Sequence, residues 1–338
     1  MTPGDSQNRG PGDMISEGAA SAPFLGLDLG GTSIKWVTLV DGQVAAKGQV
    51  PTPQSGVDDV LAALARLAAA APDAQAIGVA AAGALDPVSG RLLVAPNIAG
   101  DWSRRPIGAQ LATATGRPVS LANDARAFAY GQLRYGAAAG SSDALFVTLG
   151  TGIGGAVASD GQLRLGLGRR GGEIGHMPIE PVDGRKCGCG AIGCLESIAG
   201  GRALAELGAD LVRTGAAPAL AAEVAGRPEA VAPADVVRAA DRDPACARLV
   251  ARAGHALGMA LAGLANALAP EVIVFGGGVA AGLPAFRPHI DDILSRHTVL
   301  VENPRIVTAF DGHAGAIGAA AWAAEPPPGY PPAILPAS

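Results

Sequence analysis

Two stretches of this sequence have the same construction: FLGLDLGGTSIKWVTLVDG at residues 24–42 and ALFVTLGTGIGGAVASDG at residues 144–161. In each, an apolar strand leads into a turn of glycine and threonine, and a second apolar run ends at an Asp-Gly pair, which favours a tight β-hairpin turn. The strands are expected at 24–28, 33–40, 144–148 and 156–159. Because the two copies lie a whole domain apart, the pattern predicts two domains of like construction, each with one glycine hairpin.

The rest of the chain alternates between helical and strand patterns, which indicates an α/β fold. Helices are expected at 58–71, 124–134, 256–269 and 314–324, and strands at 76–82, 119–122 and 272–275. A length of 338 residues is ordinary for two domains. The expected parts are a disordered tail at 1–23, an N-terminal domain at 24–122, a C-terminal domain at 123–311 and a second disordered tail at 326–338.

The composition excludes several classes of protein. Hydrophobic residues make up 49% of the chain and the net charge is −5, so a surface for nucleic acid or anionic membrane, which needs clustered positive charge, is not expected. The apolar segment 256–269 is shorter than a membrane span, and residues 1–22 lack the basic and apolar regions of a signal peptide. We therefore expect a cytoplasmic enzyme.

The two glycine turns are candidates for binding phosphate groups. Glycine leaves backbone N–H groups open to an anion, and a threonine hydroxyl adds a further donor. Together the turns could grip a triphosphate, while Asp28, just before the first turn, could hold Mg²⁺ through water. Either turn alone is typical of an ordinary hairpin, but their duplication favours phosphate binding. The turn residues are Gly30, Gly31, Thr32, Gly150, Thr151 and Gly152.

The spacing Gly150-x-Gly152-x-x-Gly155 also fits the fingerprint of dinucleotide-binding proteins. Such a site needs a helix that begins within the third glycine and faces the pyrophosphate. Residues 156–161 instead indicate a strand and a hairpin turn, and Glu173 lies in a glycine-rich loop rather than at the end of a second parallel strand. The sequence therefore disfavours a dinucleotide site.

Three of the four cysteines, Cys187, Cys189 and Cys194, lie within eight positions, and His176 precedes them. Three thiolates and an imidazole complete a tetrahedral zinc site without an open position, so the predicted site is structural rather than catalytic. The intervening glycines allow the backbone to wrap tightly around one ion. Cys246 stands alone on a predicted helix and is expected to be a packed thiol.

Glu173 and Glu196 flank the predicted metal loop, which spans 173–196. If zinc makes this loop rigid, the carboxylates become well-placed acceptors for the hydroxyl groups of a polyol, which need partners when buried. Solvated loop acids are an equally good interpretation, and the residues alone leave this choice open.

Five motifs together resemble the ROK family of sugar kinases and repressors. They are DLGGT at 28–32, Asn123-Asp124, TLGTGIGG at 148–155, EIGH at 173–176 and CGCGAIGCLE at 187–196. The resemblance covers essentially residues 24–324, and its cysteine segment with the preceding EIGH is highly specific. It implies the actin-like, ribonuclease H-like ATPase fold: two similar α/β domains around a cleft, with a last helix, about 312–325 here, that returns to the first domain.

Position by position, the resemblance implies that Asp124 is the catalytic base that takes the proton of the attacking sugar hydroxyl. The implied sugar-binding residues are Gly83, Asn97, Asn123, Asp124, Glu173, His176 and Glu196. The implied nucleotide-binding residues are Asp28, Gly30, Gly31, Thr32, Ser33, Gly150, Thr151, Gly152, Gly277 and Gly278. ATP, Mg²⁺ and a structural Zn²⁺ complete this site, and a homodimer or homotetramer is expected because family members commonly form them.

The chain departs from the family pattern at three positions. Ala82 stands where proline usually precedes Gly83, and Ser33 stands where lysine usually follows Thr32, as in some β-glucoside kinases and polyphosphate-using glucokinases of the family. Because polyphosphate users generally lack the zinc segment, ATP is the expected donor. Arg126 replaces a small residue or asparagine, and the resemblance gives it no role.

The expected activity is the ATP- and Mg²⁺-dependent phosphorylation of a hexose, with glucose as the first choice. A kinase for N-acetylmannosamine, N-acetylglucosamine, fructose, mannose, allose or a β-glucoside, or a polyphosphate-dependent glucokinase, is the alternative. A non-catalytic sugar sensor or repressor is disfavoured, because a DNA-binding head needs roughly 60–80 residues whereas 23 precede the first strand.

Overall fold

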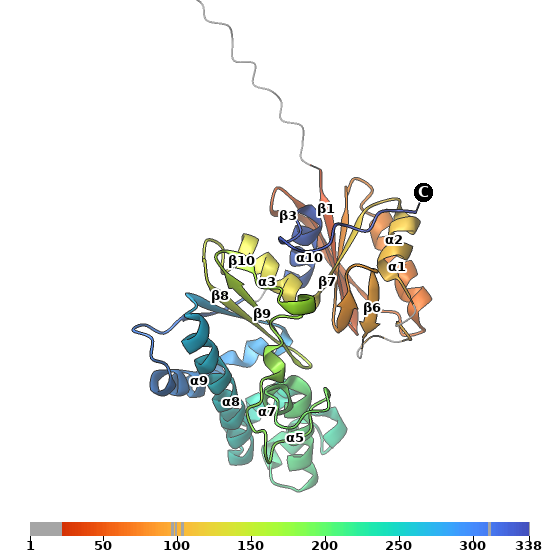
Figure 1. Cartoon of the computed structure of the whole chain (residues 1–338). Coiled ribbons are helices and arrows are strands. Elements are labelled where there is room, and N and C mark those ends of the chain that lie inside the picture. The colour runs from red at the N-terminus through yellow and green to blue at the C-terminus, as the bar shows by residue number, and fades with distance from the viewer. Residues whose placement is uncertain (1–21, 96–97, 99, 103–104, 310–311, 338) are drawn as a thin grey trace, which may run out of the picture.

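Two five-stranded sheets of matching topology form the centre of the protein in a computed structural model (Figure 1). The structure describes residues 22–95, 98, 100–102, 105–309 and 312–337, so the predicted N-terminal tail lies outside it except for Ala22 and Pro23. The strand orders are β3-β2-β1-β4-β7 and β10-β9-β8-β11-β12. In each sheet three antiparallel strands are followed by two strands parallel to the first of them in the chain, which confirms the predicted fold class.

The first sheet consists of β1 (Phe24–Leu29), β2 (Ser33–Val40), β3 (Gln43–Pro51), β4 (Ile77–Ala81) and β7 (Val119–Asn123). The second consists of β8 (Ala144–Leu149), β9 (Ile153–Ser159), β10 (Gln162–Leu163), β11 (Val272–Gly276) and β12 (Arg305–Thr308). A small hairpin, β5 (Ala84–Asp86) and β6 (Arg91–Val94), forms a separate sheet.

Helices cover both sheets. In the first part of the chain these are α1 (Val57–Ala69) and α2 (Ile107–Thr115), which share a core cluster with β1, β4 and β7. On the second sheet, α8 (Pro244–Leu268) and α9 (Leu283–His297) share a cluster with β8 and β11. The remaining helices are α3 (Asp124–Tyr135), α4 (Glu196–Ala199), α5 (Gly201–Arg213), α6 (Pro218–Glu223), α7 (Pro233–Ala239) and α10 (Ala314–Ala324).

Helices α3 and α10 pack between the two sheets, and their core cluster includes residues from both, such as Ala80 in β4 and Phe146 in β8. The approach is unusually close because glycines face the helices. A Cβ atom on Gly26 in β1 would lie 1.9 Å from the carbonyl oxygen of Ala316, and one on Gly318 would lie 1.7 Å from that of Ala127. This packing of small residues fixes the end of β1, where Asp28 lies, relative to the start of α3.

The second strand of the second hairpin is longer than the sequence predicted. The apolar pattern places it at 156–159, yet β9 begins at Ile153. Position 154 lies within the strand and requires glycine because α3 packs closely against it. A Cβ atom there would lie 2.7 Å from Cβ of Ala125. The glycine that breaks the apolar pattern is therefore a packing site rather than part of the turn.

The C-terminal segment is ordered as far as Ala337, which corrects the prediction of a disordered tail at 326–338. Tyr330 packs edge-on against Trp322 in α10, with ring centroids 4.8 Å apart, and its hydroxyl donates to a β7 carbonyl. Ile334 exchanges two backbone hydrogen bonds, 2.8 and 2.9 Å long, with the first residue of β7. The prolines suggested disorder, but β7 is an edge strand whose unpaired backbone groups bind this segment.

Replacing Tyr330 with alanine should lower the free energy of unfolding by about 2 kcal/mol, because the variant loses the ring contact with Trp322 and the hydroxyl contact with β7. Urea unfolding measures this effect. The matched control is Leu335→Ala in the same segment, since the Leu335 side chain is 68% exposed. Equal unfolding midpoints for the two variants would show that the segment does not stabilise the fold.

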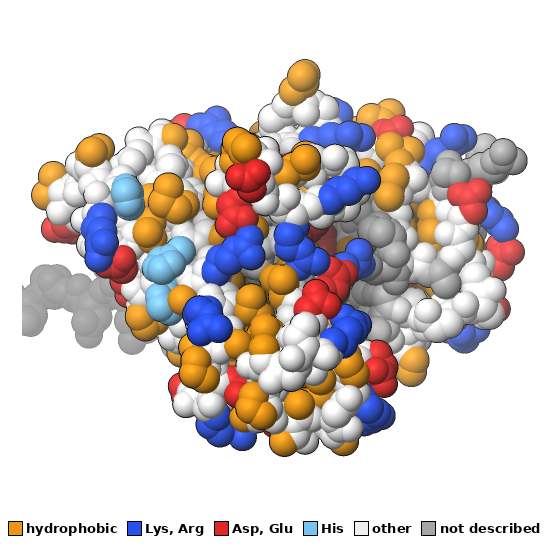
Figure 2. All heavy atoms as spheres, turned by 90° about the horizontal axis from the view of Figure 1, so that it is seen from below, with side chains coloured by type: hydrophobic (Ala, Val, Ile, Leu, Met, Phe, Trp, Pro, Cys, Tyr) orange, Lys and Arg blue, Asp and Glu red, His pale blue; other side chains and the backbone are white. Residues whose placement is uncertain are grey.

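The face of the molecule drawn in Figure 2 carries charges of both signs. Figure 2 shows basic and acidic side chains interspersed over one face, in keeping with the net charge of −5. Among the described residues, no helix has the length and apolar character needed to traverse a bilayer.

Candidate active site

Asn123 and Asp124 occupy the junction between β7 and α3, as the sequence predicted. Asn123 caps the helix, because its Oδ1 accepts from the backbone N–H of Arg126 at 3.3 Å. Its Nδ2 donates to the carbonyl oxygen of Gly83 at 3.2 Å and to Oδ1 of Asp124 at 3.0 Å. The backbone N–H of Ala125 donates to the same Oδ1 at 2.9 Å. The cap therefore fixes one oxygen of the Asp124 carboxylate and brings Gly83 beside the junction.

Asp28 and Asp124 are partly buried carboxylates within electrostatic range of one another. Burial raises the pKa of Asp124 above its usual range, although the backbone N–H of Ala125 and the Arg126 guanidinium act in the opposite direction. Burial and the nearby Asp124 raise the pKa of Asp28 to about 6, against an opposing effect of Lys35. Carboxylates with raised pKa values are typical of sites that move protons or bind cations.

Replacing Asp28 with asparagine should stabilise the protein above pH 6 when no Mg²⁺ is present. The folded chain holds the Asp28 proton up to about pH 6, whereas an unfolded chain releases it near the ordinary value of 3.8. The folded state therefore binds more protons between these values, and its stability falls as the pH rises through them. Asparagine removes this loss, which is about 1–3 kcal/mol.

Urea midpoints at pH 4 and pH 8 measure the effect of the Asp28→Asn substitution. The variant should be more stable than the wild type at pH 8, and the difference should be smallest at pH 4. An advantage of the same size at both pH values would contradict the raised pKa.

The first glycine turn, residues 30–32, is closed by its own backbone and braced from the end of β3. Gly30 N–H donates to the carbonyl oxygen of Ser33 at 3.1 Å. Thr52 Oγ1 donates to the carbonyl oxygen of Gly30 at 2.6 Å, and Gln54 Nε2 donates to that of Gly31 at 2.9 Å. Sequence reasoning missed Thr52 and Gln54, because they lie 22 and 23 residues from their partners and belong to no motif.

The second glycine turn, residues 150–152, is closed and braced in a similar way. Gly150 N–H donates to the carbonyl oxygen of Gly152 at 3.0 Å, and the first two residues of α5 donate to the carbonyl oxygens of Gly150 and Thr151 at 3.0 and 2.9 Å. Gly277 lies behind the turn with a φ of +89°, where a Cβ atom would lie 2.3 Å from the carbonyl oxygen of Leu149. Gly278 then starts a 3-10 helix, so both predicted glycines stand at the end of β11.

The two glutamates that flank the cysteine loop are both held by the protein. Oε2 of Glu196 accepts from the backbone N–H of Ile153 at 2.9 Å, which joins the loop to the second glycine turn. Glu173 is exposed and its Oε1 lies 2.9 Å from the guanidinium of Arg126. Each of the two carboxylates therefore has a partner within the protein.

Gly83 leads from β4 into the small β5-β6 hairpin, and only glycine fits there. Its φ is +113°, and a Cβ atom would lie 1.9 Å from the carbonyl oxygen of Val94. Hydrogen bonds bring together three members of the predicted sugar-binding set, Gly83, Asn123 and Asp124. Asn97 of that set lies outside the described residues.

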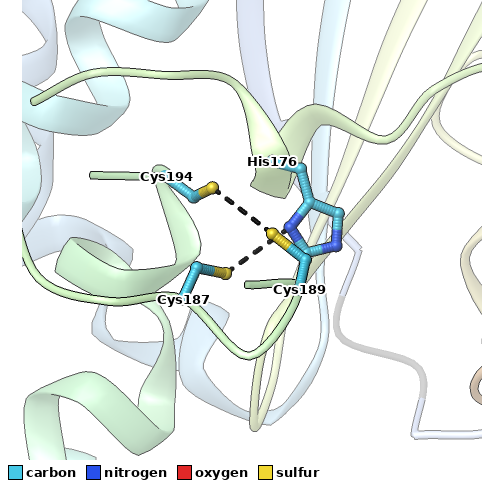
Figure 3. A group of neighbouring side chains, drawn as sticks. All are labelled: His176, Cys187, Cys189 and Cys194. Carbon is cyan, nitrogen blue, oxygen red and sulfur yellow. Dashed lines mark hydrogen bonds between the residues drawn. The ribbon is translucent and has the colours of Figure 1, made fainter. Parts of the chain in front are cut away.

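His176 and the three clustered cysteines converge on one point (Figure 3). Their potential ligand atoms all lie within 4.8 Å of one another. Sγ of Cys187 lies 3.7 Å from Nδ1 of His176, and Sγ of Cys189 lies 3.7 Å from that of Cys194. The fourth cysteine, Cys246, is buried in α8, as predicted for a packed thiol.

The donor set fits zinc. Burial raises the pKa of the Cys187 thiol, and burial together with neighbouring thiols raises that of Cys194 to about 12. A hydrogen bond from the backbone of Ala191 lowers the pKa of Cys189, so only one of the three thiols favours the thiolate without a cation. A divalent ion stabilises the thiolates, and Zn²⁺ is typically held by three cysteines and one histidine in a closed tetrahedron.

The duplicated sheets, with a glycine turn at the corresponding hairpin of each, define a protein of the actin-like, ribonuclease H-like ATPase fold. The chain belongs to the ROK family, whose profile matches residues 24–325.

Individual relatives are similar over nearly the whole chain. The glucokinase of Halalkalibacterium halodurans is 33% identical, covering 87% of this chain and 91% of its own. The N-acetylmannosamine kinase of Escherichia coli O157:H7 is 31% identical, covering 88% and 96%. The crystal structure of a ROK family glucokinase from Streptomyces griseus in complex with glucose and AMPPNP has a TM-score of 0.77 at 31% identity, covering 90% of this chain and 99% of that chain.

Proposed function

We propose that the protein transfers the γ-phosphoryl group of ATP to a hexose and converts glucose to glucose 6-phosphate. The observation that carries this proposal is the Asp124 carboxylate, which is partly buried, is fixed by Asn123 and has a raised pKa. The similarity to the glucokinases of Halalkalibacterium halodurans and Streptomyces griseus supports glucose as the substrate.

Asp124 acts as the catalytic base in this reaction. The 6-hydroxyl oxygen of the sugar forms a bond to the γ-phosphorus, while the bond from that phosphorus to the β,γ-bridging oxygen breaks and ADP leaves. The hydroxyl proton passes to the Asp124 carboxylate. Phosphoryl transfer depends mainly on positioning and charge stabilisation, so one carboxylate suffices as a late proton acceptor.

The two glycine turns bind the phosphate groups of ATP. The N–H groups of Gly30 and Gly150 close the turns themselves, so the phosphates meet the other backbone N–H groups and the hydroxyls of residues 30–33 and 150–152, and the glycines 277 and 278 lie near the adenosine. Because the turn carbonyls are already tied back by the protein, the turns need little reorganisation on binding. Asp28 holds Mg²⁺ through water, since magnesium keeps most of its hydration shell.

The sugar lies between the α3 junction and the cysteine loop. Gly83 and Asn123 contact it from one side, and Glu173, His176 and Glu196 contact its hydroxyls from the other; Asn97 belongs to the same proposed set but lies outside the described residues. Glu173 suits this role because its side chain is 54% exposed and leaves a carboxylate oxygen for a ligand.

Zinc at His176, Cys187, Cys189 and Cys194 is structural. The ion would cross-link the loop and supply no catalytic position. The hydrogen bond from the backbone N–H of Ile153 to Glu196 supports this role, because it ties the cysteine segment to the proposed phosphate-binding turn.

Another acceptor sugar is the second candidate, favoured by the similarity to an N-acetylmannosamine kinase. A coupled assay for ADP with glucose, mannose, fructose, allose, N-acetylglucosamine, N-acetylmannosamine and a β-glucoside decides between them. We expect the highest kcat/KM with glucose. A higher kcat/KM with N-acetylmannosamine would identify that sugar as the substrate instead of glucose. Turnover with polyphosphate in place of ATP would identify polyphosphate as a phosphoryl donor.

The organisation of the enzyme follows the same proposal. We place the boundary between the two domains at residues 122 and 123, with α10 returning to the first domain and 326–337 following it. The proposed oligomer is a homodimer or homotetramer. The proposed location is the cytoplasm, where ATP is available and thiols stay reduced.

A further inference from the structure

Arg126 lies on the first turn of α3, two residues after Asp124, and its side chain is only 9% exposed. The guanidinium leaves the helix toward the loop that precedes the cysteine segment. Nε and Nη2 both donate to the carbonyl oxygen of Gly171, at 3.2 and 2.9 Å. Nη2 also donates to Oε1 of Glu173 at 2.9 Å. One buried side chain thus connects the catalytic helix to the loop 47 residues later.

The loop needs such a connection because its backbone is glycine-rich. Gly172 has a φ of +92°, and a Cβ atom on Gly171 would lie 2.6 Å from the carbonyl oxygen of Arg164. Glycine has more conformational freedom to lose than any other residue, so this segment has little intrinsic order. The charged fork of Arg126 meets a carbonyl and a carboxylate together and so fixes both position and direction.

The position of Glu173 also affects the next residues of the site. Its backbone carbonyl accepts from the N–H of His176 at 3.0 Å, which closes the 3-10 turn that carries the histidine. A shift of Glu173 would therefore reach two of the proposed sugar contacts at once.

We propose that Arg126 is a positioning residue of the sugar site, which sets the distance between the base on α3 and the sugar-binding side chains of the 171–176 loop. This inference rests on the proposed function. Arg126 does not touch the reacting atoms. It acts through Glu173: Nη2 of Arg126 binds Oε1 and so orients the carboxylate, while the exposed part of the Glu173 side chain faces the ligand.

Arg126→Lys is the test variant, because lysine keeps the charge but cannot donate from a planar fork to two acceptors. The KM for glucose should rise about tenfold or more, with kcat changed less and the KM for ATP within about twofold. The matched control is Arg134→Lys on the same helix, whose side chain is 39% exposed and pairs with Glu325. This control should leave all three constants unchanged.

A double-mutant cycle with Glu173→Ala separates positioning from general damage to the fold. If Arg126 acts through Glu173, Arg126→Lys should have little further effect on kcat/KM for glucose once Glu173 is alanine. If the two substitutions instead lower kcat/KM for glucose by independent factors that multiply in the double variant, the proposal is overturned. A rise in the KM for ATP equal to that for glucose, which is the result expected of a loosened fold, would also overturn it.

Calorimetric titration of glucose into the wild type and Arg126→Lys distinguishes this proposal from the proposed function. A wild type that binds glucose without turnover overturns the kinase assignment, and weaker binding by the variant then still supports the positioning role. A wild type that neither binds nor phosphorylates any of the sugars overturns both. Equal glucose affinity in the two proteins overturns the role of Arg126 alone.

Discussion

Asp124→Asn should lower kcat by about 10²–10⁴-fold while the KM for the sugar changes by less than about threefold. Asparagine has the same shape, and its Oδ1 can still accept from the N–H of Ala125 and from Asn123. The capped start of α3 is therefore kept. The asparagine side chain cannot take the proton of the sugar hydroxyl as the bond from its oxygen to phosphorus forms.

Steady-state kinetics with glucose and ATP measure this effect, with the exposed Asp73→Asn as a control that should behave as the wild type. Retention of more than a few per cent of turnover in Asp124→Asn would remove Asp124 from the role of base. A large rise in the sugar KM with kcat unchanged would assign it to binding alone.

The second large effect concerns the cysteine loop. Replacing both Cys187 and Cys189 with serine should abolish the stoichiometric zinc of the purified protein and lower kcat/KM for the sugar about 10²-fold. The proposed ion would hold the loop that carries His176 and Glu196, and Glu196 in turn accepts from the backbone N–H of Ile153, next to the second glycine turn. Loss of the metal is therefore expected to disorder both the proposed sugar-binding loop and the second glycine turn.

Metal analysis and kinetics on the same preparations test this prediction. Cys246→Ser is the matched control, because that thiol lies in α8, outside the cluster. It should retain one zinc per chain. Substoichiometric zinc in a fully folded, fully active wild type would refute a structural metal site.

Local patterns in the sequence predicted the fold class and the bounds of several strands. Apolar runs bounded by glycine turns placed β1, β2 and β8 to within a residue. The Asn-Asp pair after an apolar strand predicted the start of α3, because asparagine is a strong helix cap. Spacing alone brought His176 and the three cysteines together, and the structure confirms that they converge.

Contacts between distant segments were beyond sequence reasoning. The sequence pattern leaves Gly154 outside the predicted strand, because its packing against Ala125 gives no local signal. The sequence predicts disorder at 326–338, since the edge of β7 that Tyr330 and Ile334 bind belongs to a distant part of the chain. The bond from Arg126 to Glu173 joins residues 47 positions apart, so the arginine had no visible role in the sequence.

The most direct test follows the phosphorus-containing products by ³¹P NMR. The wild type and Asp124→Asn are each incubated with ATP, Mg²⁺ and glucose. The account predicts that the wild type forms glucose 6-phosphate and ADP in equal amounts and that the variant forms almost none. Release of inorganic phosphate without any sugar phosphate, or equal product from the two proteins, would contradict it.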